Sequence, residues 1–304
     1  MLRGRVVEGE PLSRHTTIRI GGPARWFVEP ADAEDLHRVL EWCRTHGVPY
    51  TVIGLGSNLL VPDEGYDGVV ISLQKAAGWV RFDGTTVEAG AGYPISRLVQ
   101  EAARRGLAGL LGLAGVPGTV GGAVAMNAGT PHGEMKDVVQ SVRYLAPDGR
   151  VVEAPREALR FGYRHSRFLE EPSIVLAARL ELRPADAETE VRRLREHLAR
   201  RNAMQPVEWP NTGSVWTNPP GEYAGRLIEE AGLKGARRGG AQISPKHANF
   251  IINLGGASAG DVLGLMAQAR AAVLKRHGIL LQPEVRWLEG QEALERRLAE
   301  PPGD

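Results

Sequence analysis

The alternation of apolar and polar residues at the start of the chain predicts a strand, a helix and a second strand. Residues 25–28 and 49–53 are apolar runs of strand length. Between them, Asp32 can cap a helix that ends at Gly47. Its apolar residues, spaced to form one face, are Leu36, Val39, Leu40 and Cys43. A βαβ unit of this kind predicts a small parallel sheet.

The middle of the chain has mostly β-type patterns. Strands are predicted over 69–71 and 173–182, and two hairpins are predicted around Asp83-Gly84 and Asp148-Gly149. One helix lies between the hairpins in sequence, with Pro94 near its start and Gly106 beyond its end. Its inward positions are Ile95, Leu98, Val99 and Ala102.

The last third of the chain predicts an α/β arrangement. A charged helix over 187–201 follows a domain boundary near Pro184, and a second helix is expected over 222–231. A strand over 249–253 precedes a helix that Ser258 and Asp261 start with a capping box, and a final strand is expected over 284–287. We therefore expect one domain over 1–184, with lobes of about 1–67 and 68–184, and a second over 185–304.

Composition and charge narrow the function classes. The 304 residues include 37 Lys and Arg against 36 Asp and Glu, and the net charge of +1 predicts no nucleic-acid binding. The single cysteine, Cys43, and the lack of a secretory pattern favour the cytoplasm. The uncharged run 106–131 has the length of a membrane span, but its glycines and Pro117 argue against membrane insertion. No His/Cys cluster has metal-ligand spacing, so no metal site is expected.

Two glycine-bearing loops are the main candidates for chemistry: 54–61, directly after a predicted strand, and 115–129. Glycine lets backbone N–H groups approach a phosphate and form an anion-binding concavity without a lysine. Neither loop matches a Walker or Rossmann pattern. Each loop by itself is equally compatible with a tight turn between packed strands.

Together with the segment 17–23, Thr-Ile-Arg-Ile-Gly-Gly-Pro, these loops resemble those of the UDP-N-acetylenolpyruvoylglucosamine reductases, flavoenzymes of peptidoglycan precursor synthesis. The resemblance extends from about Thr16 to Trp287. It implies an α+β fold, in which a vanillyl-alcohol-oxidase/PCMH-type FAD-binding fold of two α/β lobes precedes a C-terminal α/β substrate domain. It also implies non-covalent FAD, held by Gly54, Leu55, Gly56, Ser57, Asn58, Leu59, Gly115, Val116, Pro117, Gly118, Thr119, Gly121, Gly122, Ala123 and Asn127.

The resemblance also implies three catalytic residues. The segment 161–168 resembles the family's Tyr-Arg motif, which makes Arg164 the catalytic arginine and Tyr163 a substrate contact. Segment 213–219 matches the one that holds a proton-donating serine, here Ser214, and 281–285 matches the one that holds a catalytic glutamate, here Glu284. Taken alone, these residues are more typical of a surface ion-pair partner, a turn or cap serine and a partner of Arg286 than of catalytic residues.

Other expected substrate contacts are Arg200, Asn218 and His247, although a lone histidine before a strand is more typical of a structural residue. The chain departs from the family where Met204 and Thr217 replace two frequent lysines. Substitutes for their charge would come from Arg200, Arg201, Arg237, Arg238 or Lys246. The absence of a tyrosine between Arg164 and Glu222 resembles the family's shorter form, which lacks a tyrosine loop.

The implied activity is NADPH-dependent reduction of UDP-N-acetylglucosamine-enolpyruvate to UDP-N-acetylmuramate. In the family, hydride passes from flavin N5 to the enolpyruvyl β-carbon while a serine supplies the α-proton. Negative charge then develops at the substrate carboxylate, which a cation such as Arg164 can bind and Glu284 can polarise further. We expect a monomer whose partners are NADPH and the UDP-sugar. The alternatives are an FAD-linked oxidase of another substrate and a nucleotide-binding regulatory protein.

Overall fold

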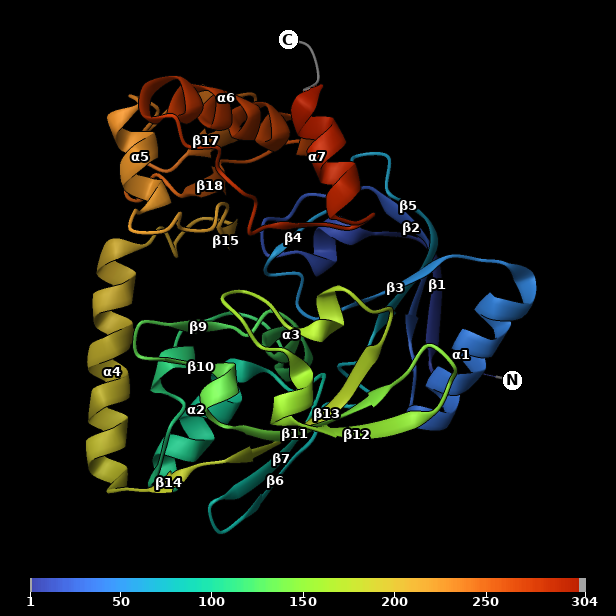
Figure 1. Ribbon diagram of the computed structural model, residues 1–304. Coiled ribbons are helices and arrows are strands. Elements are labelled where there is room, and N and C mark those ends of the chain that lie inside the picture. The colour runs from blue at the N-terminus through green and yellow to red at the C-terminus, as the bar shows by residue number, and fades with distance from the viewer. Residues whose placement is uncertain (1, 301–304) are drawn as a thin grey trace. The chain divides into compact units, whose positions relative to one another are not determined.

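The computed structural model describes residues 2–300, and the chain forms two compact units that are interleaved in sequence (Figure 1). One comprises Met1–Val6, Val28–Gly54 and Ile71–Arg201, and the other Val7–Phe27, Leu55–Val70 and Asn202–Asp304. Residues 1 and 301–304, which the predicted domains include, lie outside the described part.

The predicted first helix and its flanking strands are confirmed. Helix α1 (Ala33–His46) begins at Asp32, whose side chain accepts the Asp35 N–H, and ends at Gly47 in the left-handed conformation with φ of 65°. Strand β2 (Pro23–Glu29) precedes α1 and strand β3 (Tyr50–Ile53) follows it. Both belong to a four-stranded sheet of order β1-β2-β5-β3, with β1 at Arg5–Pro11 and β5 at Tyr66–Ser72.

A five-stranded antiparallel sheet of order β12-β11-β13-β7-β6 contains both predicted hairpins. Its strands are β6 (Val80–Asp83), β7 (Thr86–Gly90), β11 (Val139–Leu145), β12 (Val151–Pro155) and β13 (Ile174–Glu181). Helix α3 (Val120–Ala125), which the sequence did not predict, packs on β13 and β7. The glycine-rich segment is therefore mounted directly on this sheet.

The rest of this unit consists of two further helices and two short strand pairs. The predicted helices are confirmed as α2 (Ile95–Arg104) and α4 (Ala187–Met204), and the chain passes into the second unit near the end of α4. The short pairs are both antiparallel: β8 (Leu107–Ala108) with β14 (Arg183–Pro184), and β9 (Gly129–Thr130) with β10 (Gly133–Glu134).

The second unit has a four-stranded sheet of order β15-β18-β17-β16, and Figure 1 shows α6 lying along β17 and β18. Its strands are β15 (Asn211–Ser214), β16 (Arg237–Arg238), β17 (Ala241–Ile243) and β18 (Phe250–Asn253). Its helices are α5 (Ala224–Glu230), α6 (Ala259–His277) and α7 (Gln291–Ala299). The capping box of Ser258 and Asp261 is confirmed, whereas α7 was not predicted.

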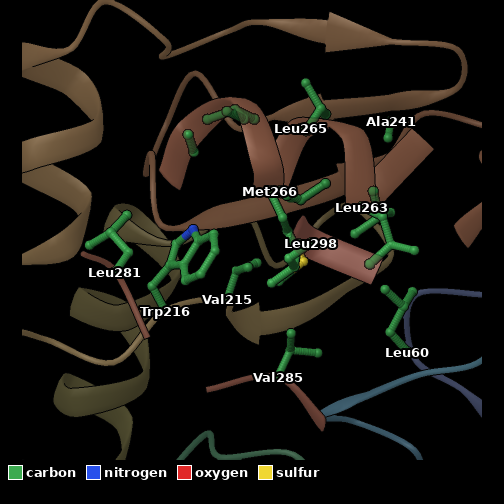
Figure 2. Close-up of a cluster of buried hydrophobic side chains, with 14 of the residues drawn as sticks. Leu60, Val215, Trp216, Ala241, Leu263, Leu265, Met266, Leu281, Val285 and Leu298 are labelled. Atoms are coloured by element: carbon green, nitrogen blue, oxygen red, sulfur yellow. The ribbon is translucent and has the colours of Figure 1, made fainter. Parts of the chain in front are cut away.

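Trp216, with only 1% of its surface exposed, lies in the apolar core of the second unit (Figure 2). Met266 from α6 and Leu298 from α7 contribute to the same cluster. The predicted last strand is reduced to β19 (Arg286–Trp287), which pairs in parallel with β4 (Leu59–Leu60). This pairing places the first glycine loop beside the segment that contains Glu284. Within residues 2–300, no helix has the length and apolar character needed to cross a bilayer.

Asp35 provides a test of the first unit. Its side chain is fully buried, and its carboxylate accepts the N–H groups of Arg3, Gly4 and Ala31 at 3.0, 2.7 and 3.1 Å. Asp35→Ala leaves these donors without an acceptor, so we expect the free energy of unfolding to fall by roughly 1–3 kcal/mol in denaturant titrations. The control Asp67→Ala removes an exposed partner of Arg25 and should change stability by less than about 0.5 kcal/mol.

The same carboxylate should make stability depend on pH. Burial raises the pKa of Asp35, but the N–H groups of Ala31, Arg3 and Gly4 outweigh it and hold the pKa below its ordinary value of 3.8. Because the folded pKa is the lower one, this contribution is present above pH 3.8 and is lost as the pH falls through the folded pKa. Unfolding measured below pH 4 should therefore show a smaller difference between wild type and Asp35→Ala.

Candidate active site

The glycine-rich segment is bound along its backbone to the residues that lead into α2. The Gly121 N–H donates to the Ala91 carbonyl at 2.8 Å, and the Val120 N–H donates to the Tyr93 carbonyl at 2.9 Å. A Cβ atom on Gly121 would lie 2.9 Å from the Cβ of Ala91, closer than side-chain atoms pack. Glycine is therefore required here for close packing as well as for any ligand.

Several backbone N–H groups of this segment are available for an anion. Among the described residues, the N–H groups of Gly118, Thr119 and Gly122 have no acceptor. Gly122 is exposed, and a Cβ atom placed on it would meet only the Thr119 Oγ1 atom, at 3.8 Å. Successive N–H groups around a position without a side chain form a concavity that fits a phosphate. The segment thus fits the diphosphate of a dinucleotide.

The first residue of the first glycine loop, 54–61, contacts the glycine-rich segment. A Cβ atom on Gly54 would lie 2.6 Å from the Oγ1 atom of Thr119, so the start of the loop contacts the glycine-rich segment directly. Gly56 has φ of 60°, and its carbonyl accepts the Thr17 N–H at 3.3 Å. A Cβ atom on Gly56 would lie 2.1 Å from the His15 carbonyl oxygen. The segment 15–17 therefore fixes the conformation of this loop.

Tyr163 and Arg164 occupy the tip of a tight turn. The N–H of Gly162 donates to the His165 carbonyl at 3.0 Å, and the N–H of His165 donates back to the Gly162 carbonyl at 3.3 Å. Arg164 has φ of 53°, a left-handed conformation that is uncommon for residues with a Cβ atom. Its guanidinium lies 5.1 Å from the centre of the Tyr163 ring, and Tyr163 is 51% exposed.

The side chain of Asn127, which was expected to contact FAD, is engaged within the protein. It is fully buried, and its Nδ2 group donates to the Gly162 carbonyl at 2.8 Å and to Glu134 Oε2 at 3.1 Å. Its Oδ1 atom accepts the Lys136 N–H at 2.9 Å. The two donors and the acceptor of the carboxamide each have a protein partner.

Ser214 and Glu284 lie on neighbouring backbone segments of the second unit. The Val215 carbonyl accepts the N–H groups of Glu284 and Val285 at 2.8 and 3.2 Å. The Asn58 side chain donates to the Glu284 carbonyl at 3.0 Å. One backbone oxygen thus joins the segments of the serine and the glutamate, and a residue of the first glycine loop holds the glutamate segment from the other side.

Of the other expected substrate contacts, Asn218 and His247 both contact the start of α5, where a Cβ atom on Gly225 would lie 3.0 Å from the Cε1 atom of His247. Asn218 accepts the Ala224 N–H at 3.0 Å at the start of α5, and Arg200 donates to the Glu196 carbonyl at 3.4 Å. His247 accepts the Asn249 N–H at its Nδ1 atom, and burial lowers the pKa of this imidazole below its ordinary value, with Lys234 adding to the effect. The neutral form of His247 is therefore favoured.

Two arginines that the sequence did not assign to the FAD site contact the glycine loops. Arg201 packs on the glycine-rich segment, since a Cβ atom on Gly115 would lie 2.6 Å from its Cδ atom. Arg286 donates its backbone N–H to the Asn58 carbonyl at 3.0 Å. Neither guanidinium has an acidic partner within residues 2–300, and burial lowers the pKa of both. The alternative pairing of Arg286 with Glu284 is not formed, and both arginines remain available for an anion.

Comparison with known proteins identifies the class. The family model described as "FAD binding domain" matches residues 24–155, and the model of the C-terminal domain of UDP-N-acetylenolpyruvoylglucosamine reductase matches residues 205–288. A reductase of this name from Heliobacterium modesticaldum is 50% identical over 285 residues, which cover 93% of this chain and 91% of the relative. Reductase 2 of Symbiobacterium thermophilum is 47% identical over 283 residues, or 93% and 92% of the two chains.

The crystal structure of the Thermus caldophilus enzyme, UDP-N-acetylenolpyruvylglucosamine reductase, matches with a TM-score of 0.80 and 41% identity, over 94% of this chain and 99% of that one. The protein is thus a flavin-dependent oxidoreductase with an α+β fold, in which a vanillyl-alcohol-oxidase/PCMH-type FAD-binding fold is followed by a C-terminal α/β domain. The chain belongs to the family of UDP-N-acetylenolpyruvoylglucosamine reductases.

The variant Gly122→Ala can test FAD binding separately from folding. Gly122→Ala puts a methyl group in the proposed phosphate concavity, where steric overlap of about 1–3 kcal/mol should weaken FAD binding by roughly tenfold or more. In the apoprotein the methyl group has space, and alanine in a helix is favoured over glycine by about 0.5–1 kcal/mol. Titration of apoprotein with FAD and thermal unfolding without FAD should therefore change in opposite directions. Unchanged FAD affinity would argue against this concavity.

Proposed function

We propose that the protein catalyses the NADPH-dependent reduction of UDP-N-acetylglucosamine-enolpyruvate to UDP-N-acetylmuramate in peptidoglycan precursor synthesis. The observation that carries the proposal is the junction at Val215, which brings the segments of Ser214 and Glu284 together in a chain 50% identical to a reductase of this name. By the same relationship, we assign it to the cytoplasm, to cell-wall biogenesis and so to cell shape and division, and we expect a monomer. Residues 1–184 would form the FAD-binding domain and 185–304 the substrate domain.

The two glycine loops would hold FAD without a covalent bond. The N–H groups of Gly118, Thr119 and Gly122 would bind its diphosphate, with further contacts from 54–59 and from 115–123. Arg201 and Arg286 are the cations best suited to the phosphate charge, because each is partly buried and lacks an acidic partner in the described chain. When bound, FAD supplies the route by which hydride passes from NADPH to the β-carbon of the enolpyruvyl ether.

Arg164, Glu284 and Ser214 would act on the enolpyruvyl group. Hydride addition places negative charge on the α-carbon and its carboxylate, so the Arg164 guanidinium would bind that carboxylate bidentately. Glu284, protonated or through a water, would polarise the same group, and the Ser214 hydroxyl would donate the α-proton. Tyr163, Arg200, Asn218 and His247 are proposed substrate contacts.

Lys246 is a poor replacement for the positive charge of the two lysines whose positions Met204 and Thr217 occupy. Its Nζ atom donates to the Asn202 carbonyl at 2.7 Å and lies 3.4 Å from Glu208, so part of its charge is already neutralised. Arg200 carries no ion pair in the described residues, which makes it the better candidate for the substrate diphosphate.

Ser214→Ala tests the proton-donating role. A positioned proton donor contributes about 10²- to 10⁴-fold, so we expect flavin reoxidation by the enolpyruvyl substrate to slow by that factor. Flavin bleaching by NADPH should proceed at the wild-type rate, because that half-reaction needs no α-proton. Anaerobic stopped-flow absorbance measures both steps, with Ser141→Ala, on the five-stranded sheet, as the matched control. Reoxidation at the wild-type rate in Ser214→Ala would exclude the role.

The order of the two half-reactions distinguishes the proposal from an oxidase of the same fold. NADPH and the UDP-sugar are proposed to use one site in turn, so double-reciprocal plots should be parallel. Intersecting lines would contradict the shared site. If flavin bleached by NADPH recovered only with oxygen and not with the enolpyruvyl substrate, an FAD-linked oxidase would be favoured instead.

A further inference from the structure

The turn that carries Arg164 is strained. Two of its hydrogen bonds join Gly162 and His165. The left-handed conformation of Arg164 is unfavourable for a residue with a Cβ atom, so it persists only where its surroundings impose it. The contacts at the two ends of the turn therefore contribute to fixing the backbone of Arg164.

Asn127 holds the first end. Its Nδ2 group donates to the Gly162 carbonyl, the same oxygen that receives the His165 N–H and closes the turn. Glu134 and the Lys136 N–H engage the other side of the carboxamide and fix its orientation. Since the side chain is fully buried, water cannot replace any of these bonds.

Ser166 holds the second end. Its side chain is fully buried, and its Oγ atom donates to the Ala125 carbonyl at 2.7 Å. Ala125 is the last residue of α3 and Asn127 follows it by two positions. The turn is thus attached at both ends to residues of the glycine-rich segment itself.

We propose that Asn127, supported by Ser166, is a positioning residue that sets Arg164 relative to the FAD-binding segment. It acts through the Gly162 carbonyl, in place of the direct cofactor contact expected from sequence. The inference rests on the proposed role of Arg164. A carboxamide is required because it alone offers two donors and an acceptor in one plane. Asparagine also tolerates the left-handed conformation of position 127, where φ is 41°.

The test uses the FAD-loaded enzyme and the variant Asn127→Asp. Aspartate keeps the size, the tolerance of positive φ and an acceptor for Lys136, but it places an oxygen against the Gly162 carbonyl and against Glu134. A displacement of about 1 Å can cost about 100-fold, so we expect reoxidation by the enolpyruvyl substrate to slow by roughly 10- to 100-fold. FAD affinity and the rate of bleaching by NADPH should stay within about threefold of wild type.

A double-mutant cycle with Arg164→Ala separates positioning from general damage. If Asn127 acts through Arg164, Asn127→Asp should cause no further loss in the Arg164→Ala background. Additive losses, or loss of FAD in Asn127→Asp, would overturn the inference while leaving the role of Arg164 intact. Wild-type reoxidation in Arg164→Ala alone would instead refute the role of Arg164, whereas failure of the enolpyruvyl substrate to reoxidise the wild-type flavin would refute the proposed function.

Ser166→Ala provides the second variant, in case Asn127→Asp does not fold. It removes one buried donor from the opposite end of the turn and should give the same pattern, with slower reoxidation, retained FAD and no further loss in the Arg164→Ala background. An unchanged reoxidation rate in Ser166→Ala, with Asn127→Asp unfolded, would show that the turn does not depend on these anchors.

Discussion

The organisation of the first unit depends on how closely two backbone segments approach each other. Residues 118–121 lie against residues 91–95, and the approach is possible only because Gly121 offers no Cβ atom to Ala91. That contact orients the N–H groups proposed to bind the FAD diphosphate. The residues that continue the segment, Ala125 and Asn127, are also the ones that hold the Arg164 turn. The proposed cofactor site and the proposed position of Arg164 would therefore depend on the same segment of backbone.

In the second unit, backbone hydrogen bonds bring together residues that are far apart in sequence. The Val215 carbonyl joins the segments of Ser214 and Glu284. Val215, Trp216 and Val285, which are close to them in sequence, lie in the apolar core (Figure 2). Placing the anchoring residue in the core and the reactive residue next to it in sequence limits the movement of the reactive segment. The packed core thus restricts the movement of the backbone next to Ser214 and Glu284.

Local signals in the sequence predicted much of the fold but little of the site. Asp32 and Gly47 define α1, and the capping box of Ser258 defines α6, because these effects act within one helical turn. Helix α3 was missed because glycines within 120–125 argue against a helix, although packing on β13 and β7 stabilises it. The approach of Ser214 and Glu284 depends on hydrogen bonds between remote segments, so only the family resemblance could suggest it. The role inferred for Asn127 depends on three partners that no spacing reveals.

The pairing around Trp216 also has a topological consequence. Trp216 forms a bridge with Pro283, and the Thr217 N–H donates to the carbonyl of Gln282, which follows 65 positions later. The chain therefore returns at Gln282 to the residues that it left at Thr217. Helices α5 and α6 lie in the stretch between these two positions. Because hydrogen bonds join both ends of this stretch, a change in the length of an exposed loop within it need not alter the register between the segments of Ser214 and Glu284.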